Sequence, residues 1–162
     1  MWLFNRLYLI AFSVVLLTAC GFTPVHAPGG SAAGLQGRIV VAEPDDRNSY
    51  ILVQELEQRL GQPSAPAYDL SFSLIVEDEG QAVTETGEIT RYSITGLAAY
   101  ALTPLGSEDP VLSGEVDTFT GYSATGSTVE TLAAERDARR RLMVILADRI
   151  TTELYTLTDL SP

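Results

Sequence analysis

The sequence predicts an α+β fold in which two helices pack on one face of a four-stranded sheet, in the order β-α-β-β-β-α. Three observations predict it. Alternating apolar and polar residues mark strands at 35–42, 68–79, 88–104 and 111–124. Apolar residues at helical spacing mark helices at 48–60 and 128–157. The last three strands follow one another across short turns, so we expect them to be antiparallel neighbours.

Residues 1–19 have the pattern of an export signal. Arg6 supplies a positive charge, and an uncharged apolar run follows from Leu7 to Leu17. As a helix this run would be about 16 Å long, which is shorter than the roughly 30 Å hydrocarbon core of a bilayer. The segment is therefore predicted to be a cleaved signal peptide and not a membrane anchor.

Cys20 is the only cysteine, and it ends the stretch LTAC directly after the apolar run. This stretch has the form of a lipobox, in which the thiol of a bacterial lipoprotein accepts a diacylglycerol unit before cleavage. A lone cysteine is often a buried core thiol, but the residues around Cys20 are the end of a signal. We predict that Cys20 becomes the lipidated N-terminus. Gly21, in place of an aspartate, favours sorting to the outer membrane.

The mature chain is predicted to have two parts. Residues 20–34 hold the lipidated cysteine and a flexible tether with two prolines and four glycines. Residues 35–158 are long enough to form one domain with its own core. Its first strand, at 35–42, would face inward with Leu35, Gly37, Ile39 and Val41.

The helix at 48–60 has local start and stop signals. The preceding residues, EPDDRNS, include several that can cap a helix, and Gly61 with Pro63 ends it. Its apolar stripe is Leu52, Val53, Leu56 and Leu60.

The strands at 68–79 and 88–104 alternate clearly. Their inward residues are Tyr68, Leu70, Phe72, Leu74 and Val76, then Tyr92, Ile94, Ala98, Tyr100 and Leu102. The strand at 111–124 is less regular, so we expect a β-bulge near Phe119. The opposite sheet face is predicted to be small and polar, and therefore solvated or available to a partner: Ser71, Ser73, Arg91, Ser93, Thr95, Ala99, Glu115 and Asp117.

The helix at 128–157 begins with the capping-box spacing of Ser127 and Glu130. Its apolar stripe is Leu132, Leu142, Met143, Leu146, Ile150 and Leu154. Its length of about 45 Å exceeds what a small sheet needs, so we expect one end to project.

Charge excludes several kinds of partner. All ten basic residues are arginines, and removal of the signal leaves nine of them against 21 acidic residues, a net charge of −12. Such a chain is a poor binder of nucleic acid and of anionic lipid head groups. Attachment to a membrane is therefore expected to come from the lipid on Cys20.

The sequence offers no pattern for catalysis, a metal or a cofactor. His26 is the only histidine and lies in the tether, so neither a metal site nor a catalytic triad is predicted. The acidic run EDE at 77–79 lacks the loop of oxygen ligands that calcium requires, and we interpret it as the end of a strand.

Four stretches together resemble the LptE (RlpB) family of lipopolysaccharide-assembly lipoproteins. They are LTACGF.P, RNSYILVQELEQRL, RYSITGLAAYALT and AERDARRRLMVILADRITTEL, in that order. The resemblance implies two helices on a four-stranded sheet. It also implies a role that is not enzymatic, as the plug of the outer-membrane barrel LptD, which delivers lipopolysaccharide to the cell surface.

The alternatives are an auxiliary lipoprotein of a periplasmic ABC-type lipid-transport system, with a similar order of elements, and a periplasmic hydrolase. The absence of a catalytic pattern disfavours the hydrolase. The identity of the membrane partner would separate the first two.

The dense basic cluster is ERDARRR at 135–141. Two i,i+4 pairs, Glu135–Arg139 and Asp137–Arg141, are expected to neutralise part of its charge. Arg136 and Arg140 are left as candidates for contact with lipopolysaccharide phosphates, since arginine binds phosphate in a bidentate manner. The alternative is a salt-bridged helix face that meets solvent or a protein. Arg91 is a second candidate, on the outward sheet face, where a rim or partner-contact role is more common.

Overall fold

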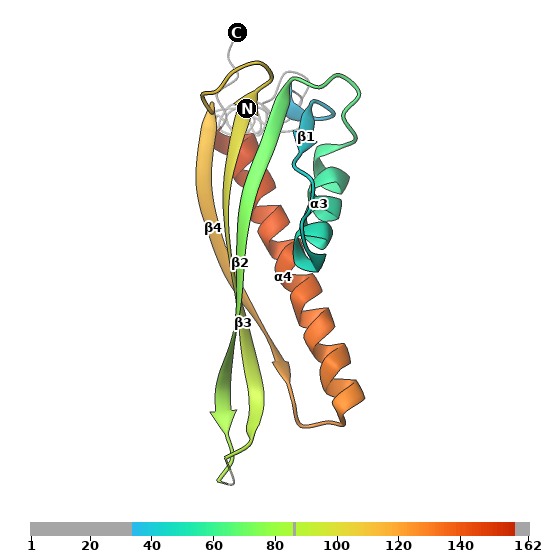
Figure 1. The fold of residues 1–162 in the computed structure, drawn as a ribbon, viewed down its shortest axis with the longest axis vertical. Coiled ribbons are helices and arrows are strands. Elements are labelled where there is room, and N and C mark those ends of the chain that lie inside the picture. Colours follow the sequence, from blue (N-terminus) through green and yellow to red (C-terminus); the bar gives the residue numbers. More distant parts are fainter. Residues whose placement is uncertain (1–33, 86, 158–162) are drawn as a thin grey trace, which may run out of the picture.

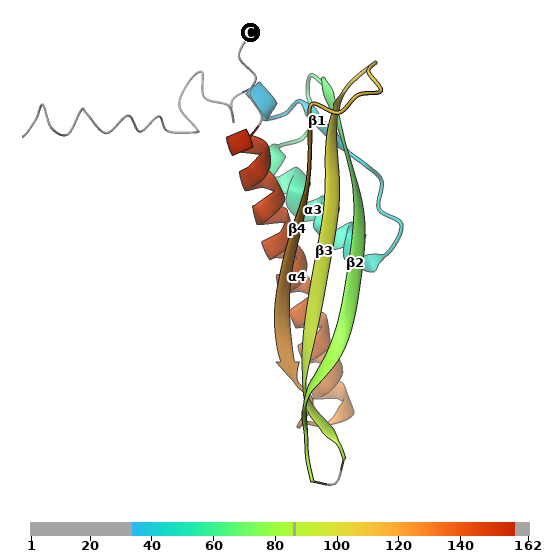
Figure 2. The ribbon, with the colours of Figure 1, turned by 90° about the vertical axis from the view of Figure 1, so that its left-hand side faces the viewer.

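Two helices lie on one face of a four-stranded sheet in the computed structural model, which describes residues 34–85 and 87–157 (Figure 1; Figure 2). In chain order the elements are β1 (Ile39–Val41), α3 (Arg47–Leu60), β2 (Tyr68–Val83), β3 (Ile89–Pro104), β4 (Leu112–Ser123) and α4 (Thr128–Leu157). The strands lie side by side in the order β1-β2-β3-β4. β1 is parallel to β2, and the other two pairs are antiparallel. The predicted fold class and element order are confirmed.

Helix α3 begins and ends at residues that the sequence marks. The Asp46 carboxylate accepts a hydrogen bond from the Ser49 N–H at 2.6 Å, and the Asp46 N–H donates to the Ser49 hydroxyl at 2.8 Å. This reciprocal capping box satisfies N–H groups that have no partner within the helix. At the other end Gly61 adopts φ +78°, and its N–H donates to the Glu57 carbonyl at 2.9 Å.

Strand β1 is shorter than the predicted strand at 35–42. Leu35 is buried but lies in a helical turn, and Gly37 has φ +69°, a left-handed conformation in which a strand does not continue. The Gly37 N–H donates to the Leu60 carbonyl at 2.8 Å, which ties the start of the domain to the end of α3. Gly37 is therefore a turn residue and not an inward strand position.

Strands β2, β3 and β4 keep the predicted alternation. The predicted inward residues of β2 and β3, except Tyr92, lie in the core or pack against it. The bulge predicted near Phe119 is wrong, since the β3–β4 register is continuous. The inward face looked irregular in the sequence because a polar residue, Thr120, occupies a buried position. Its hydroxyl donates to the Ala138 carbonyl of α4 at 3.0 Å. The register shifts are instead in β2, between Gly80 and Val83.

Helix α4 crosses the inner face of β3 and β4 and also packs against α3. Its buried stripe contains Leu142, Met143, Leu146, Ile150 and Leu154, as predicted. Leu132 is an exception, since 44% of it is exposed. The first turns of α4 continue beyond the residues where α3 begins, as Figure 1 shows. In the described part of the chain, no helix combines the length and apolar character needed to cross a membrane.

Candidate functional site: an arginine-lined groove between the helices

A groove lies where the beginning of α3 meets the first third of α4. Its volume is about 500 Å³. α3 contributes Arg47, Asn48 and Ile51, and α4 contributes Glu135, Arg136, Asp137, Arg139 and Arg140. Four guanidinium groups from two helices therefore surround one hollow, together with two carboxylates.

Two of the arginines in the ERDARRR segment are held in ion pairs. Arg139 binds Glu135 at 3.0 Å and also binds Asp78, which reaches it from β2. Burial by itself would lower the pKa of Arg139, but the hydrogen bonds that it donates to Glu135 and Asp78, with the attraction of both carboxylates, outweigh burial and raise that pKa. Arg141 binds Asp137 on the outer side of the helix. Both predicted i,i+4 pairs are thus present.

The remaining arginines of the groove have exposed, uncompensated charges. Within residues 34–85 and 87–157, Arg47, Arg136 and Arg140 take part in no ion pair. Arg136 and Arg140 are one helical turn apart, so both project on the same side of α4. Three free guanidinium groups around a hollow can bind an anion with several oxygens, such as a phosphate, through charge-assisted hydrogen bonds.

Sequence reasoning identified two members of this group and missed the third. Arg47 is far from the ERDARRR segment in the sequence and lies in the run EPDDRNS, just before the helix predicted at 48–60. Nothing in the linear pattern reports that α3 and α4 pack side by side at this point. The available signal was that Tyr50 and Ile51, one helical turn after Arg47, are not acidic.

Arg91 is not part of the groove. It is exposed on β3, where its backbone is opposite Ala82 of β2 and Ser123 of β4. Its position in the alternation directs it to the sheet face that the helices leave uncovered. The structure therefore separates Arg91 from Arg136 and Arg140, and the three do not form one site.

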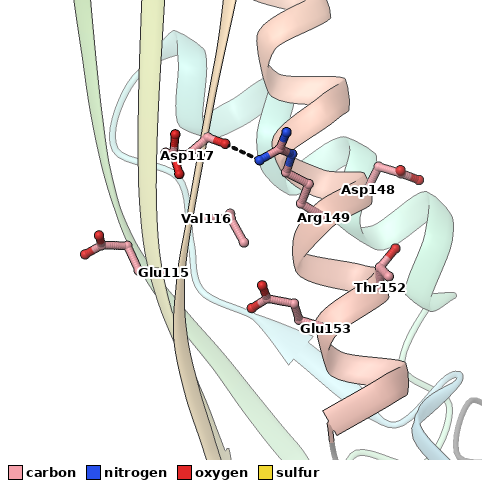
Figure 3. Close-up of a pocket in the computed structure, with 7 residues that line it drawn as sticks. All are labelled: Glu115, Val116, Asp117, Asp148, Arg149, Thr152 and Glu153. Atoms are coloured by element: carbon pink, nitrogen blue, oxygen red, sulfur yellow. Dashed lines mark hydrogen bonds between the residues drawn. The ribbon is translucent and has the colours of Figure 1, made fainter.

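A second groove, between β4 and α4, is mainly acidic. It has a volume of about 380 Å³ and is lined by Glu115, Val116, Asp117, Asp148, Arg149, Thr152 and Glu153 (Figure 3). Arg149 donates to the backbone carbonyl of Asp117 at 2.5 Å, and Glu153 accepts a hydrogen bond from the Tyr100 hydroxyl. These contacts fasten α4 to the sheet, and the carboxylates of Asp148 and Glu153, both from α4, disfavour an anionic ligand.

Two further predictions concern Cys20 and the acidic run at 77–79. Cys20, the predicted lipidation site, lies outside the described residues, as do the signal and most of the tether. The acidic run at 77–79 does not end its strand as predicted, since β2 continues to Val83. Asp78 turns inward to Arg139, while Glu77 and Glu79 lie on the opposite face. In the described residues, no group of three or more histidine, cysteine, aspartate or glutamate side chains is arranged to hold a metal ion.

Comparison with known proteins gives one family and a consistent fold. The model of the family described as "LptE: Lipopolysaccharide-assembly" matches residues 37–154. No curated protein matches the chain significantly.

Several solved structures share the fold at low identity. A lipoprotein from Caulobacter crescentus is 20% identical with a TM-score of 0.66, over 81% of this chain and 97% of that one. Lipoprotein B from Nitrosomonas europaea is 14% identical with a TM-score of 0.60, over 86% and 94%. The rare lipoprotein B from Shewanella oneidensis is 12% identical with a TM-score of 0.57, over 74% and 93%.

Proposed function

The chain belongs to the LptE lipopolysaccharide-assembly family, and we propose that it acts as the plug and assembly partner of the outer-membrane barrel LptD. The observation that carries this proposal is the family match. It begins at the turn before β1 and ends within the last turn of α4, so it includes the four strands, α3 and nearly all of α4.

We propose that the chain is held at the periplasmic side of the outer membrane by acyl chains on Cys20. Two or three chains give stable anchoring, while one alone gives only marginal binding. The domain itself is too acidic to be drawn to anionic head groups. Its role would be to bind and position other molecules, without catalysis and without a cofactor.

Direct contact with lipopolysaccharide is proposed at the arginine-lined groove. Arg136 and Arg140 would bind phosphates of the glycolipid, with Arg47 as the third cation. This contact must be local, because the net charge of the chain repels an anionic ligand elsewhere. Arg91, on the other side of the sheet, is a separate and weaker candidate.

A pair of variants tests this contact. Replacing Arg136 and Arg140 with glutamate should weaken lipopolysaccharide binding while recovery of LptD in a pull-down stays unchanged. Arg38→Glu is the matched control, since Arg38 is also exposed, takes part in no ion pair among the described residues and does not line the groove. Unchanged lipopolysaccharide binding in the double variant would exclude the groove as the binding site.

A further inference from the structure

The sheet face that the helices leave uncovered, here called the outer sheet face, carries an apolar patch. It consists of Ile75 on β2, Leu97 on β3 and Phe119 on β4. Phe119 is 72% exposed and Ile75 is 55% exposed, although apolar side chains of this size are usually buried. The sequence predicts a small and polar face here, and the exposed patch shows that this prediction is wrong.

The three patch residues are neighbours in the sheet register. Ile75 lies directly opposite Leu97, and Phe119 lies opposite Thr95, on the diagonal from Leu97. Directly opposite and diagonal side chains on one sheet face are within contact distance. A shallow hollow of about 300 Å³ is present at this place, lined by all three residues together with Glu77, Thr95, Gly96, Asp117 and Thr118.

Acidic residues lie on the same sheet face as the patch, and Glu77 and Asp117 border it directly. Alternation along β2 and β4 puts five of them on the outer sheet face: Asp69, Glu77, Glu79, Glu115 and Asp117. None of these five takes part in an ion pair with another described residue. Arg91 is the single basic residue on the same face of the three long strands.

We propose that the outer sheet face is the docking surface for the protein partner, and that the partner presents an apolar centre surrounded by lysine or arginine side chains. The charge pattern selects this occupant. A second copy of the chain would bring like charges together, which costs free energy, and an anionic glycolipid would be repelled. The identity of the partner rests on the proposed function, in which it is the barrel LptD.

Substitutions in the patch test the apolar part of this proposal. Full-length lipidated chain carrying Phe119→Asp or Ile75→Asp should bind purified LptD about tenfold or more weakly, because an exposed apolar anchor is replaced by a charge. Val129→Asp is the matched control, since Val129 is 77% exposed on the first turn of α4 and away from this face. Equal binding by all three variants and the wild type would overturn the proposal.

Charge reversal tests the acidic part. Asp117→Arg and Glu77→Arg should weaken binding and reduce its sensitivity to salt, because attraction between opposite charges is screened by ions. Glu108→Arg, in the exposed turn between β3 and β4, is the control. It should leave the affinity for LptD and its dependence on salt unchanged. Tighter binding by Asp117→Arg and Glu77→Arg would contradict a basic partner surface.

Photo-cross-linking tests the same surface without introducing a charge that could impair folding. An aromatic photoreactive residue at 119 should cross-link to LptD, and the same group at 129 should not. A cross-link from 119 to a second copy of the chain would instead identify a self-association surface and overturn the proposal. If the wild-type chain does not bind LptD at all, the proposed function is wrong. If the wild type and the patch variants bind LptD equally well, only the proposed docking surface is wrong.

Discussion

At the scale of single residues, the structure distinguishes positions that look alike in the sequence. Leu132 and Leu146 belong to the same apolar stripe of the last helix, yet Leu132 is 44% exposed and Leu146 is fully buried. Leu146 packs where α4 approaches β3: a Cβ built on Gly96 would lie 3.1 Å from the Leu146 Cδ1. The close approach at a glycine leaves little free space around this leucine.

Leu146→Ala should therefore lower the free energy of unfolding by about 2–5 kcal/mol, because it leaves a cavity in a tightly packed site. Leu132→Ala makes the same chemical change on the same helix and should cost less than about 0.5 kcal/mol. Thermal or urea unfolding of the domain measures both. Equal effects of the two substitutions would show that the packing around Leu146 is wrongly assigned.

Cys20→Ala tests the predicted lipid anchor. Since Cys20 is the only thiol in the chain, the variant should carry no acyl group and should keep its signal peptide. Mass spectrometry of the N-terminal peptide reports both properties. A diacylated or triacylated N-terminus on the variant would rule out Cys20 as the lipidation site.

At the scale of elements, local signals predicted most helix and strand bounds. The helix starts at Asp46 and Ser127 were marked by capping residues, and both capping boxes are formed. The errors have local causes. Gly37 has the spacing of a strand residue but adopts a left-handed turn, and Thr120 obscured the alternation of β4 because its hydroxyl is satisfied by a carbonyl of another element.

What the sequence did not reveal depends on tertiary packing. The groove joins Arg47 to Arg136 and Arg140 through the contact of two helices that are distant in the chain. The apolar patch joins one residue from each of three strands, so no single strand reveals it. Only the strand register brings Ile75, Leu97 and Phe119 together.

Asp46→Ala tests the capping box of α3. At neutral pH it should cost about 1 kcal/mol of stability. Hydrogen bonds from Ser49 lower the pKa of Asp46 below its usual 3.8, so this contribution is present above about pH 4 and is lost as the pH falls through the lower folded-state pKa. The stability difference from wild type should shrink with acid. Asp109→Ala, in an exposed turn, is the control. A stability difference between Asp46→Ala and wild type that does not change with pH would argue against a charged cap.

At the scale of the whole molecule, the sheet separates two surfaces of opposite character. The helix side carries a groove with three uncompensated arginines, and the outer sheet face carries an apolar patch among carboxylates. A chain with these two surfaces can hold an anionic glycolipid on one side while a protein with a basic surface covers the other.

Depleting the chain from cells tests this division of roles. If the chain is needed by its barrel partner, its loss should leave LptD misassembled as well as lipopolysaccharide undelivered at the cell surface. Heat-modifiable migration of LptD on gels reports barrel folding, and surface labelling reports lipopolysaccharide. Fully folded LptD in depleted cells would show that the chain is not required for barrel assembly.

The most direct measurement is purification of the wild-type lipidated chain from detergent-solubilised membranes, followed by identification of the proteins bound to it. The account predicts that LptD is the main protein recovered, and that Phe119→Asp reduces its yield while Arg136→Glu with Arg140→Glu does not. Recovery of an inner-membrane transporter complex in place of LptD, or of no barrel at all, would contradict it.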